Sequence, residues 1–463
     1  MGKFIIEEKV SATVSRAACG EMLKKIWHGF THSVSELYPT VEESDKFFIR
    51  IGTAATPSLS DSEYAYTCEE SGISLVGRDK GGLVRGLFDL LMQVEYEQDG
   101  TLFIRECDGR SHFLFEKRMI HICAFAETRF SELRKLVRLA AAVGYTHAVL
   151  EFWGMFPYEC ERGLSWREAY SKDELRALAA EMRELGIEPV PMINHLGHAA
   201  NARVTGGKHS ALDTAPTLYR YFTPDGWAWD ISSPYTRELL LKMRAEQCEV
   251  FGEGEFFHLG LDEAYMYATS KKHRAMLPEY LSYITDLVVK EGRRPMIWMD
   301  MFLPPESGTK HLCVCEGEED MYKALSALNE KTVLVDWEYD YKTSPFPTAD
   351  YINKKAPEFD IMCAPWTDYG NFGAAINTVK SLSLFGFMMT TWHTMAKKMY
   401  TVLESARLFG APKAPWSDFS GSVEGKREEC ATLLRKLSFE GPSSYRDAGW
   451  CDEEISLNIG EIQ

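Results

Sequence analysis

The chain has 463 residues, and 68 acidic against 51 basic side chains give it a formal net charge of −17. Hydrophobic residues make up 45% of it and aromatic residues 12%, which excludes a disordered protein, because such chains have too few apolar side chains to build a core. The negative charge also argues against nucleic acid as a partner, since phosphate binding needs clustered Lys and Arg. It argues equally against docking on an anionic membrane surface.

The cysteines and the first residues indicate a reduced, cytoplasmic protein. The 11 cysteines are odd in number and include no C-x-x-C pair, so neither a zinc cage nor a disulfide framework is predicted. The start MGKFIIEEKV lacks the apolar core of a secretory signal, and no run approaches the ~18 apolar residues of a membrane span. We expect no cofactor, no metal and no membrane partner, and a homodimer stays open as the assembly.

Residues 1–112 predict a small α+β domain. Strand-like runs such as 47–51 and 63–67 alternate with turn-rich pieces, and a helix begins near Lys80. Leucines 83, 87, 90 and 91 recur at helical spacing and indicate one buried face. We expect this domain to pack against its neighbour and to carry no chemistry.

Residues 113–410 predict an α/β fold, a (β/α)8 TIM barrel. Helix-like segments at 132–143, 173–185, 237–250 and 277–290 separate short apolar runs. Runs that are apolar throughout are typical of strands buried on both faces, and eight of them fit a closed barrel. The runs are 119–125, 148–152, 189–193, 256–261, 296–299, 333–335, 361–364 and 387–391. Residues 411–463 are expected to form a helical and loop extension packed on the barrel.

The reactive groups of such a barrel stand where its strands end, and here those positions carry carboxylates, histidines and aromatic rings. Aromatic walls suit the apolar faces of a sugar ring. A carboxyl group in a dry pocket beside a second carboxylate has a raised pKa and can act as a general acid, which is the tool of glycoside cleavage. The candidates are Asn194, His195, His198, Asp262, Glu263, Trp298, Asp300, Trp337, Tyr339, Tyr341, Trp366, Asp368, Tyr369, Trp392 and His393.

The ordered motifs resemble those of family 20 glycoside hydrolases, the β-N-acetylhexosaminidases. Residues 258–263, HLGLDE, resemble the family's H-x-G-G-D-E signature, with Leu261 in place of the second glycine. Residues 195–199 resemble its P-G-H segment after strand 3, and residues 297–300 resemble its strand-5 Trp segment. Trp337 and Trp392 fall where the family places its other pocket tryptophans. The likeness covers residues 60 to 400 and is nearest in character to the intracellular hexosaminidase D type.

The resemblance implies exo-acting, retaining hydrolysis of a terminal β-linked GlcNAc or GalNAc, with a carbohydrate as the partner. The mechanism it implies is substrate-assisted, through an oxazoline-type intermediate. Glu263 would be the acid and then the base, and Asp262 would orient the acetamido group.

The resemblance also implies a set of substrate contacts. Arg118 would bind sugar hydroxyls, His198 would orient a carboxylate, and Asp300 would belong to the pocket. A tyrosine would donate to the acetamido oxygen, with Tyr339, Tyr341 and Tyr369 all open. The tryptophans that would box the sugar are Trp298, Trp337 and Trp392.

Two departures leave the preferred sugar open. The family often has W-x-E after strand 8, where this chain has residues 392–394, WHT. After strand 2, where many members carry His and Asp, the chain has residues 151–153, EFW.

Two other functions compete with this interpretation. In a metal-dependent barrel, Asp262 and Asp300 would hold Mg²⁺, or His195, His198 and His258 would hold Zn²⁺. The single histidine of the first strand, His121, and the amide of Asn194 after the third argue against it. A non-catalytic carbohydrate-binding barrel is the other alternative, and the intact carboxylate pair argues against that.

Overall fold

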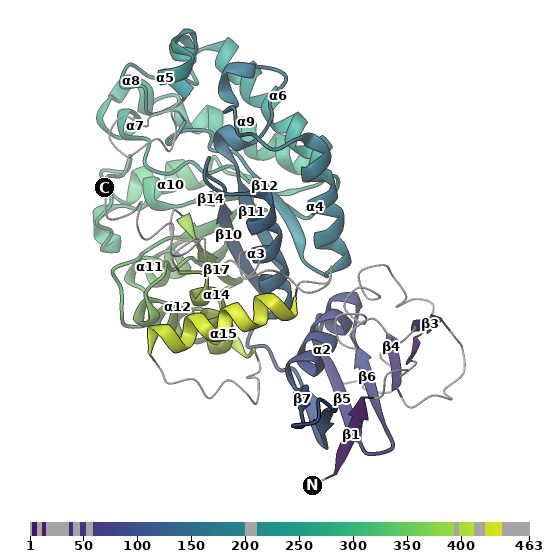
Figure 1. The fold of residues 1–463 in the computed structure, drawn as a ribbon. Helices are drawn as coiled ribbons and strands as arrows, with labels where there is room; N and C mark the ends of the chain where they lie inside the picture. The colour runs from purple at the N-terminus through teal and green to yellow at the C-terminus, as the bar shows by residue number, and fades with distance from the viewer. Residues whose placement is uncertain are drawn as a thin grey trace.

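The computed structural model describes residues 2–6, 12–14, 37–39, 47–51, 59–199, 211–392, 398–411 and 422–437. Its centre is a closed barrel of eight parallel strands in sequence order (Figure 1), so the predicted (β/α)8 fold is confirmed. Each strand overlaps one of the eight apolar runs. The strands are β10 (Lys117–Cys123), β11 (His147–Glu151), β12 (Glu188–Met192), β13 (Phe256–His258), β14 (Arg294–Trp298), β15 (Val333–Asp336), β16 (Asp360–Cys363) and β17 (Gly386–Thr390).

Helices cover the outside of the barrel because each carries one apolar face. In α3, Leu133, Leu136, Val137 and Ala140 are all buried, and this spacing puts them on one side of a helix. The main helices are α3 (Phe130–Ala142), α4 (Lys172–Glu184), α6 (Pro234–Phe251), α9 (Leu277–Lys290), α10 (Glu318–Leu325), α11 (Pro347–Lys355), α12 (Tyr369–Leu382) and α14 (Tyr400–Phe409). Short helices α5 (Ala211–Thr214), α7 (Tyr265–Thr269) and α8 (Lys271–Arg274) lie in the loops.

The interior of the barrel is filled by alternate residues of each strand, because successive side chains of a strand point to opposite faces. Met119 of β10, Val149 of β11 and Met296 of β14 belong to one buried cluster inside the barrel. Residues two and four places further along each strand therefore point inward as well. This alternation decides which side chains can meet at the end of the barrel where the strands finish.

In the part of the N-terminal domain that the structure describes, a six-stranded mixed sheet pairs with one helix and a smaller sheet. Helix α2 packs against strand β6 of the large sheet. The large sheet has β2 (Ala12–Val14), β3 (Leu37–Pro39), β4 (Phe47–Ile51), β5 (Tyr64–Glu69), β6 (Gly72–Gly77) and β9 (Cys107–Arg110). The other elements are β1 (Lys3–Ile6), α2 (Lys80–Met92), β7 (Glu95–Tyr96) and β8 (Leu102–Arg105).

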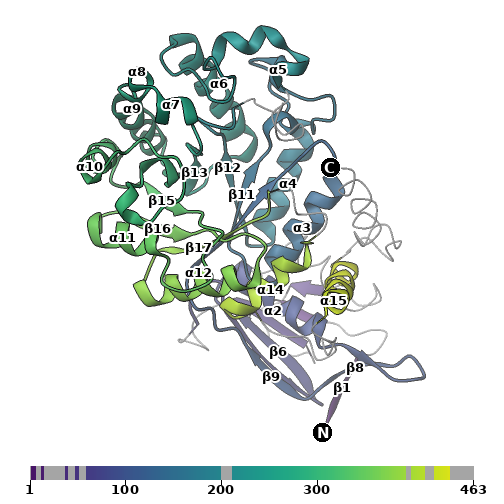
Figure 2. The same cartoon turned by 90° about the vertical axis from the view of Figure 1, so that its left-hand side faces the viewer.

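This domain lies at the end of the barrel where the strands begin (Figure 2). The buried guanidinium of Arg85 in α2 donates to the carbonyls of Tyr145, at 2.7 Å, and Gly186, at 3.2 Å. Both residues stand just before a barrel strand, β11 or β12. The domain is thus fixed at the opposite end from the one where the predicted site residues follow the strands.

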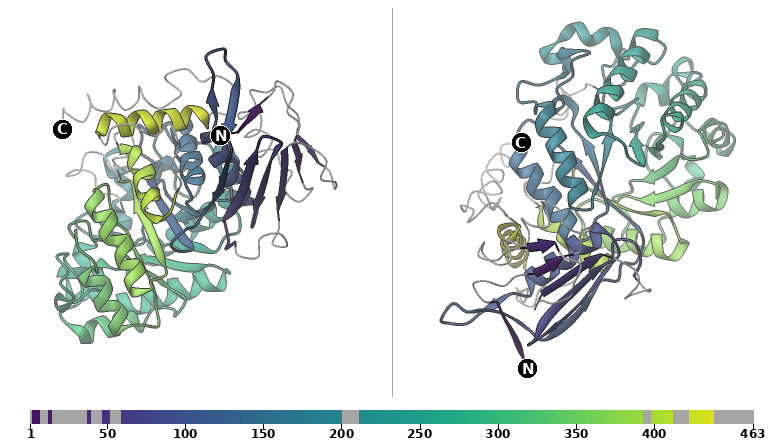
Figure 3. Two further views of the ribbon diagram at one scale, coloured as in Figure 1. Left: turned by 90° about the horizontal axis from the view of Figure 1, so that it is seen from below. Right: turned by 90° about the vertical axis from the view of Figure 1, so that its right-hand side faces the viewer.

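Within the predicted C-terminal extension the structure describes helix α15 (Val423–Lys436), which contacts α14, α3 and α2. Figure 3 shows it along the outside of the barrel, with one end near the N-terminal domain. The other residues of that extension beyond 411, and His393, lie outside the described residues. Among the helices that are described, none is long and apolar enough to cross a membrane.

Candidate active site

The two predicted catalytic carboxylates stand together at the end of the barrel, in the loop between β13 and α7. The side chain of Asp262 is 4% exposed and that of Glu263 is 27% exposed. One imidazole holds both, because His198 Nε2 lies 2.9 Å from Glu263 Oε2 and 3.3 Å from Asp262 Oδ2. One carboxylate is therefore buried and fixed, while its neighbour stays open to a bound molecule.

The backbone of this loop is held in an unusual conformation. Leu261 has φ of 82° and Glu263 has φ of 46°, and the left-handed region costs a non-glycine residue roughly 1–2 kcal/mol. Two hydrogen bonds hold Glu263 there: its N–H donates to Asp300 Oδ2 at 3.1 Å, and its carbonyl accepts from Trp227 Nε1 at 2.7 Å. Leu261 occupies the position where the family signature has glycine, which adopts this φ freely.

Gly197 brings the loop after β12 against the carboxylate loop. A Cβ at Gly197 would lie 2.0 Å from the carbonyl oxygen of Asp262, a distance that only glycine avoids. The contact explains why a glycine precedes His198 in the predicted segment. The imidazole of His198 reaches the carboxylates only when the loop after β12 and the carboxylate loop are this close.

Asp300 supports Glu263 from the neighbouring strand end, and it is 2% exposed. Its Oδ1 accepts from Trp337 Nε1 at 2.9 Å, while Oδ2 accepts from the Glu263 backbone. Burial raises the pKa of Asp300 to about 6. The two hydrogen bonds act in the opposite direction and lower this pKa, but burial has the larger effect. The ring of His311 packs against Trp337 with centroids 3.9 Å apart and the two planes tilted by 41°.

The opposite wall of the site is aromatic. Trp392 Nε1 donates to the Tyr339 hydroxyl at 2.6 Å, and Trp366 packs 5.5 Å from the same tyrosine ring. Burial raises the pKa of Tyr339 well above its ordinary value, so the hydroxyl keeps a proton that it can donate. The rings of Trp337 and Tyr339 lie 5.2 Å apart, which joins this wall to the carboxylate side.

The prediction that Arg118 binds sugar hydroxyls is wrong. Strand β10 begins at Lys117, so Arg118 lies at the entry end of the barrel, opposite the carboxylates. Its Nε donates to the Gly144 carbonyl at 2.7 Å and its Nη1 to the Phe115 carbonyl at 2.6 Å, and the guanidinium covers the Phe113 ring at 3.9 Å. It also precedes Met119, an inward residue, and therefore points out of the barrel.

Two other predicted contacts are corrected in position. Trp298 is fully buried inside the barrel, 5.9 Å beneath Trp392, so it supports the floor of the site and does not form its wall. Tyr369 is 57% exposed at the start of α12, with Lys426 Nζ 5.8 Å from its ring. Tyr341 donates to the Gly308 carbonyl at 2.9 Å, so of the three predicted tyrosines Tyr339 is the one beside the carboxylates; Tyr265, which was not predicted, also lies against Glu263.

Sequence reasoning missed the residues that come from a long loop. Trp227 lies between β12 and α6, packs 4.8 Å from His198 and 5.4 Å from Tyr265, and donates to the Glu263 carbonyl. No strand or helix pattern marks it. His195, in contrast, points outward and bonds the Tyr280 hydroxyl at 3.2 Å, so it is a core residue.

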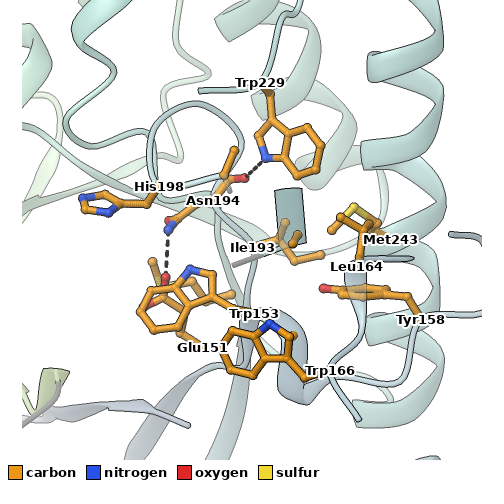
Figure 4. A pocket seen from close by; sticks show the side chains of 14 residues that line it. Glu151, Trp153, Tyr158, Leu164, Trp166, Ile193, Asn194, His198, Trp229 and Met243 are labelled. Carbon is orange, nitrogen blue, oxygen red and sulfur yellow. Dashed lines mark hydrogen bonds between the residues drawn. The ribbon is translucent and has the colours of Figure 1, made fainter. Parts of the chain in front are cut away.

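A narrow cavity of about 40 Å³ continues beneath the site, beside His198 (Figure 4). Asn194 Nδ2 donates to Glu151 Oε1 at 2.7 Å, and Trp229 Nε1 donates to the Asn194 carbonyl at 2.8 Å. Figure 4 shows both bonds, with Trp153 and Trp166 below them. The volume has room for a few water molecules. The hydrogen-bonded side chains of Asn194 and Glu151 line the end of the cavity that faces the floor of the site.

Comparison with known proteins identifies the fold. No protein-family model matches the chain. A β-hexosaminidase of Emericella nidulans is 24% identical over 178 residues, which are 33% of this chain and 29% of that protein. The chain thus matches less than a third of the length of this curated relative.

Solved structures match along the whole chain. A β-N-acetylhexosaminidase from Bacteroides fragilis NCTC 9343 superposes with a TM-score of 0.68 at 13% identity, over 97% of this chain and 96% of that one. A GH20 exo β-N-acetylglucosaminidase from Vibrio harveyi, in complex with N-acetylglucosamine, superposes with a TM-score of 0.66 at 13% identity, over 96% and 76%. The resemblance read from the motifs is thus confirmed at the level of structure, and the chain has the fold of the β-N-acetylhexosaminidases of glycoside hydrolase family 20.

Proposed function

We propose that this protein is an exo-acting, retaining β-N-acetylhexosaminidase that removes a terminal β-linked GlcNAc or GalNAc. The observation that carries the proposal is the buried Asp262 beside the open Glu263, both held by His198. An aromatic wall stands opposite them. This is the arrangement expected where a sugar ring stacks on indoles while two carboxylates act at its anomeric carbon.

Glu263 is placed to move the proton. Its carboxyl would protonate the glycosidic oxygen as the bond from that oxygen to C1 breaks, and the carboxylate left behind would later take a proton from the attacking water. His198, 2.9 Å from Glu263 Oε2, fixes the orientation of the carboxyl group. The hydrogen bond from the Glu263 backbone to Asp300 fixes where the side chain begins.

The nucleophile would be the acetamido oxygen of the substrate, which attacks C1 and closes a five-membered oxazoline-type ring. Asp262 would accept from the acetamido N–H and balance the positive charge that develops, and the Tyr339 hydroxyl would donate to the oxygen. This combines the advantage of an intramolecular attack with fixed charges aimed at the transition state. Hydrolysis of the ring by water then returns the original β configuration.

The relatives support the same substrate class. The proteins that share the fold are named as β-N-acetylhexosaminidase and exo β-N-acetylglucosaminidase, and the second was solved with N-acetylglucosamine. Because these structures are 13% identical to the chain, the functional argument depends on the site geometry above.

The test is hydrolysis of chromogenic β-GlcNAc, β-GalNAc and β-glucoside by the purified protein. We expect turnover of one or both acetamido sugars and little of the glucoside, which lacks the internal nucleophile. Equal rates on the glucoside would contradict acetamido participation. A thiazoline analogue of the cyclic intermediate should inhibit competitively, and failure to bind would count against the mechanism.

Matched variants separate the two carboxylates. Glu263→Gln should lower kcat by roughly 10²–10⁴, and Asp262→Asn by roughly 10²–10³. Asp340→Asn is the control, because this aspartate is exposed and pairs with Lys310 at 3.3 Å. Activity of either site variant within twofold of wild type would refute its assignment.

A further inference from the structure

Three potential metal ligands meet at the ends of the first two barrel strands. His121 and Cys123 are two residues apart on β10, so both point into the barrel. Glu151 of β11 stands opposite Cys123 in the strand register. All three are buried, with at most 1% of each residue exposed.

Their ligand atoms lie close enough together to share one ion. His121 Nε2 lies 3.0 Å from Glu151 Oε2, Cys123 Sγ lies 3.1 Å from the same oxygen, and Sγ lies 3.6 Å from Nε2. Zinc bonds of about 2.0–2.3 Å at tetrahedral angles put neighbouring ligand atoms about 3.3–3.6 Å apart. Sγ and Nε2 already have this spacing, and Glu151 Oε2 would have to move a few tenths of an ångström away from both. We propose that His121, Cys123 and Glu151 bind a divalent transition-metal ion of the zinc type.

Charge and surroundings favour the ion. A thiolate and a carboxylate together neutralise a divalent cation, which is the condition for burying charge in a protein core. Binding would release the proton of the Cys123 thiol. Asn194 Nδ2 donates to the other oxygen of Glu151 at 2.7 Å (Figure 4), the kind of outer contact that orients a metal-bound carboxylate.

Two neighbouring buried groups have polar atoms that no other described residue satisfies. Among the described residues, His258 Nε2 and Trp298 Nε1 have no hydrogen-bond partner. The two rings pack 4.5 Å apart, and Trp298 packs 5.6 Å from His121. Sequence reasoning tested other histidines as zinc ligands and missed this set, because its members come from two strands and three residue types.

The position of the site suggests what the ion would do, and this step rests on the proposed function. The His121 ring lies 4.7 Å from Trp392, whose indole N–H is bonded to Tyr339. An ion held by three protein ligands keeps one tetrahedral position for another ligand. We infer that a sugar hydroxyl or a water occupies it, in the role expected of Arg118 before the structure placed that side chain elsewhere.

The experiment titrates Co²⁺ into the full-length protein after removal of metal with a chelator under reducing conditions. We expect one ion per chain, a thiolate-to-cobalt charge-transfer band, tetrahedral visible bands, and displacement by Zn²⁺. Cys123→Ser should abolish the charge-transfer band, and Glu151→Gln should weaken binding. Asn194→Ala should weaken it by about 10–100-fold. Cys363→Ser is the matched control, since Cys363 is also fully buried in a barrel strand.

The outcomes separate this proposal from the proposed function. If the wild-type protein cleaves β-GlcNAc but binds neither Co²⁺ nor Zn²⁺, the metal site is overturned and the proposed function is not. The metal site is also overturned if Cys363→Ser abolishes metal binding while Cys123→Ser leaves it intact. Metal binding by a protein without glycosidase activity would leave the site standing and refute the function. Because a ligand variant could fail to fold, the rise in the Tm of wild type on adding Zn²⁺ is a second readout, and its absence also counts against the site.

Discussion

Replacing Asp300 by alanine tests how the catalytic loop is held. The Asp300 carboxylate accepts two hydrogen bonds, from the Glu263 backbone at 3.1 Å and from Trp337 Nε1 at 2.9 Å. A hydrogen bond to a charged group contributes roughly 1.5–3 kcal/mol. The left-handed conformation of Glu263, with φ of 46°, costs roughly 1–2 kcal/mol.

These two energies are of similar size, so the bond to Asp300, together with the bond from Trp227, is large enough to keep Glu263 in its strained conformation. Once the bond is lost, extended conformers of Glu263 compete with the one that faces the substrate. A loss of about 1.5–3 kcal/mol corresponds to a fall in kcat of about 10- to 150-fold. Binding of the sugar through the aromatic wall is left intact, so KM should change much less.

The assay is steady-state hydrolysis of chromogenic β-GlcNAc by Asp300→Ala, Asp300→Asn and wild type. The asparagine variant keeps one acceptor oxygen but turns an N–H₂ toward one of the two donors, so we expect an intermediate kcat. Trp337→Phe removes only the other hydrogen bond and is the matched control, with a kcat nearer to that of wild type. A kcat of Asp300→Ala within twofold of wild type would refute the claim that this carboxylate positions Glu263.

Three further predictions test the aromatic wall, the strained loop and a buried acid. Tyr339→Phe should lower kcat/KM for β-GlcNAc about tenfold, which is the effect of losing a hydrogen bond of about 1.5 kcal/mol. Tyr341→Phe is the control and should leave kcat/KM unchanged. Equal effects of the two substitutions on kcat/KM would place the acetamido contact elsewhere. Leu261→Gly should destabilise the protein less than Leu259→Gly by about 1–2 kcal/mol, because both leucines are fully buried but only Leu261 has positive φ. Urea denaturation measures the two free energies of unfolding. A smaller loss of stability in Leu259→Gly than in Leu261→Gly would contradict the prediction. Burial raises the pKa of Asp336 to about 8, so the folded protein keeps a proton that the unfolded chain loses near pH ~4, and stability falls as pH rises between the two values. The free energy of unfolding of Asp336→Asn should therefore gain on that of wild type from pH 5 to pH 8, by up to about 1.4 kcal/mol per pH unit. Urea denaturation across this range measures it, and a constant difference would show that Asp336 ionises normally.

The barrel was predictable because its signal is local. Each strand is buried on both faces and carries an apolar run, and each helix has one apolar face, so order and number follow from the sequence. The strand ends shifted by a residue or two, as with β10, which begins at Lys117 where the apolar run begins at Met119. The shift does not change the outcome for Arg118, which stands at the entry end of the strand with either boundary and so lies opposite the site.

The site was predictable only where the residues follow a strand directly. Asp262, Glu263, His198 and Asp300 do so, and the structure brings them together. Trp227 was missed because its loop folds back through contacts with the carboxylate loop, which no local pattern encodes. Trp298 and Tyr369 were misplaced for a different reason. Both rings lie near a strand end, but the alternation of side chains along a strand decides where Trp298 points, and the exposure of the helix start decides where Tyr369 points.

The strained residues of this structure gather where the chemistry is proposed. Among the described residues outside glycine, five with positive φ lie at or beside the site, namely Trp153, His198, Leu261, Glu263 and Trp392. Each costs roughly 1–2 kcal/mol, and strain persists only where the surroundings over-determine it. Such surroundings are the hydrogen bonds from Trp227 to the Glu263 carbonyl, from the Glu263 N–H to Asp300, and from Trp392 to Tyr339. The site is therefore organised before a sugar arrives, so substrate binding need not supply the free energy of arranging the catalytic loop.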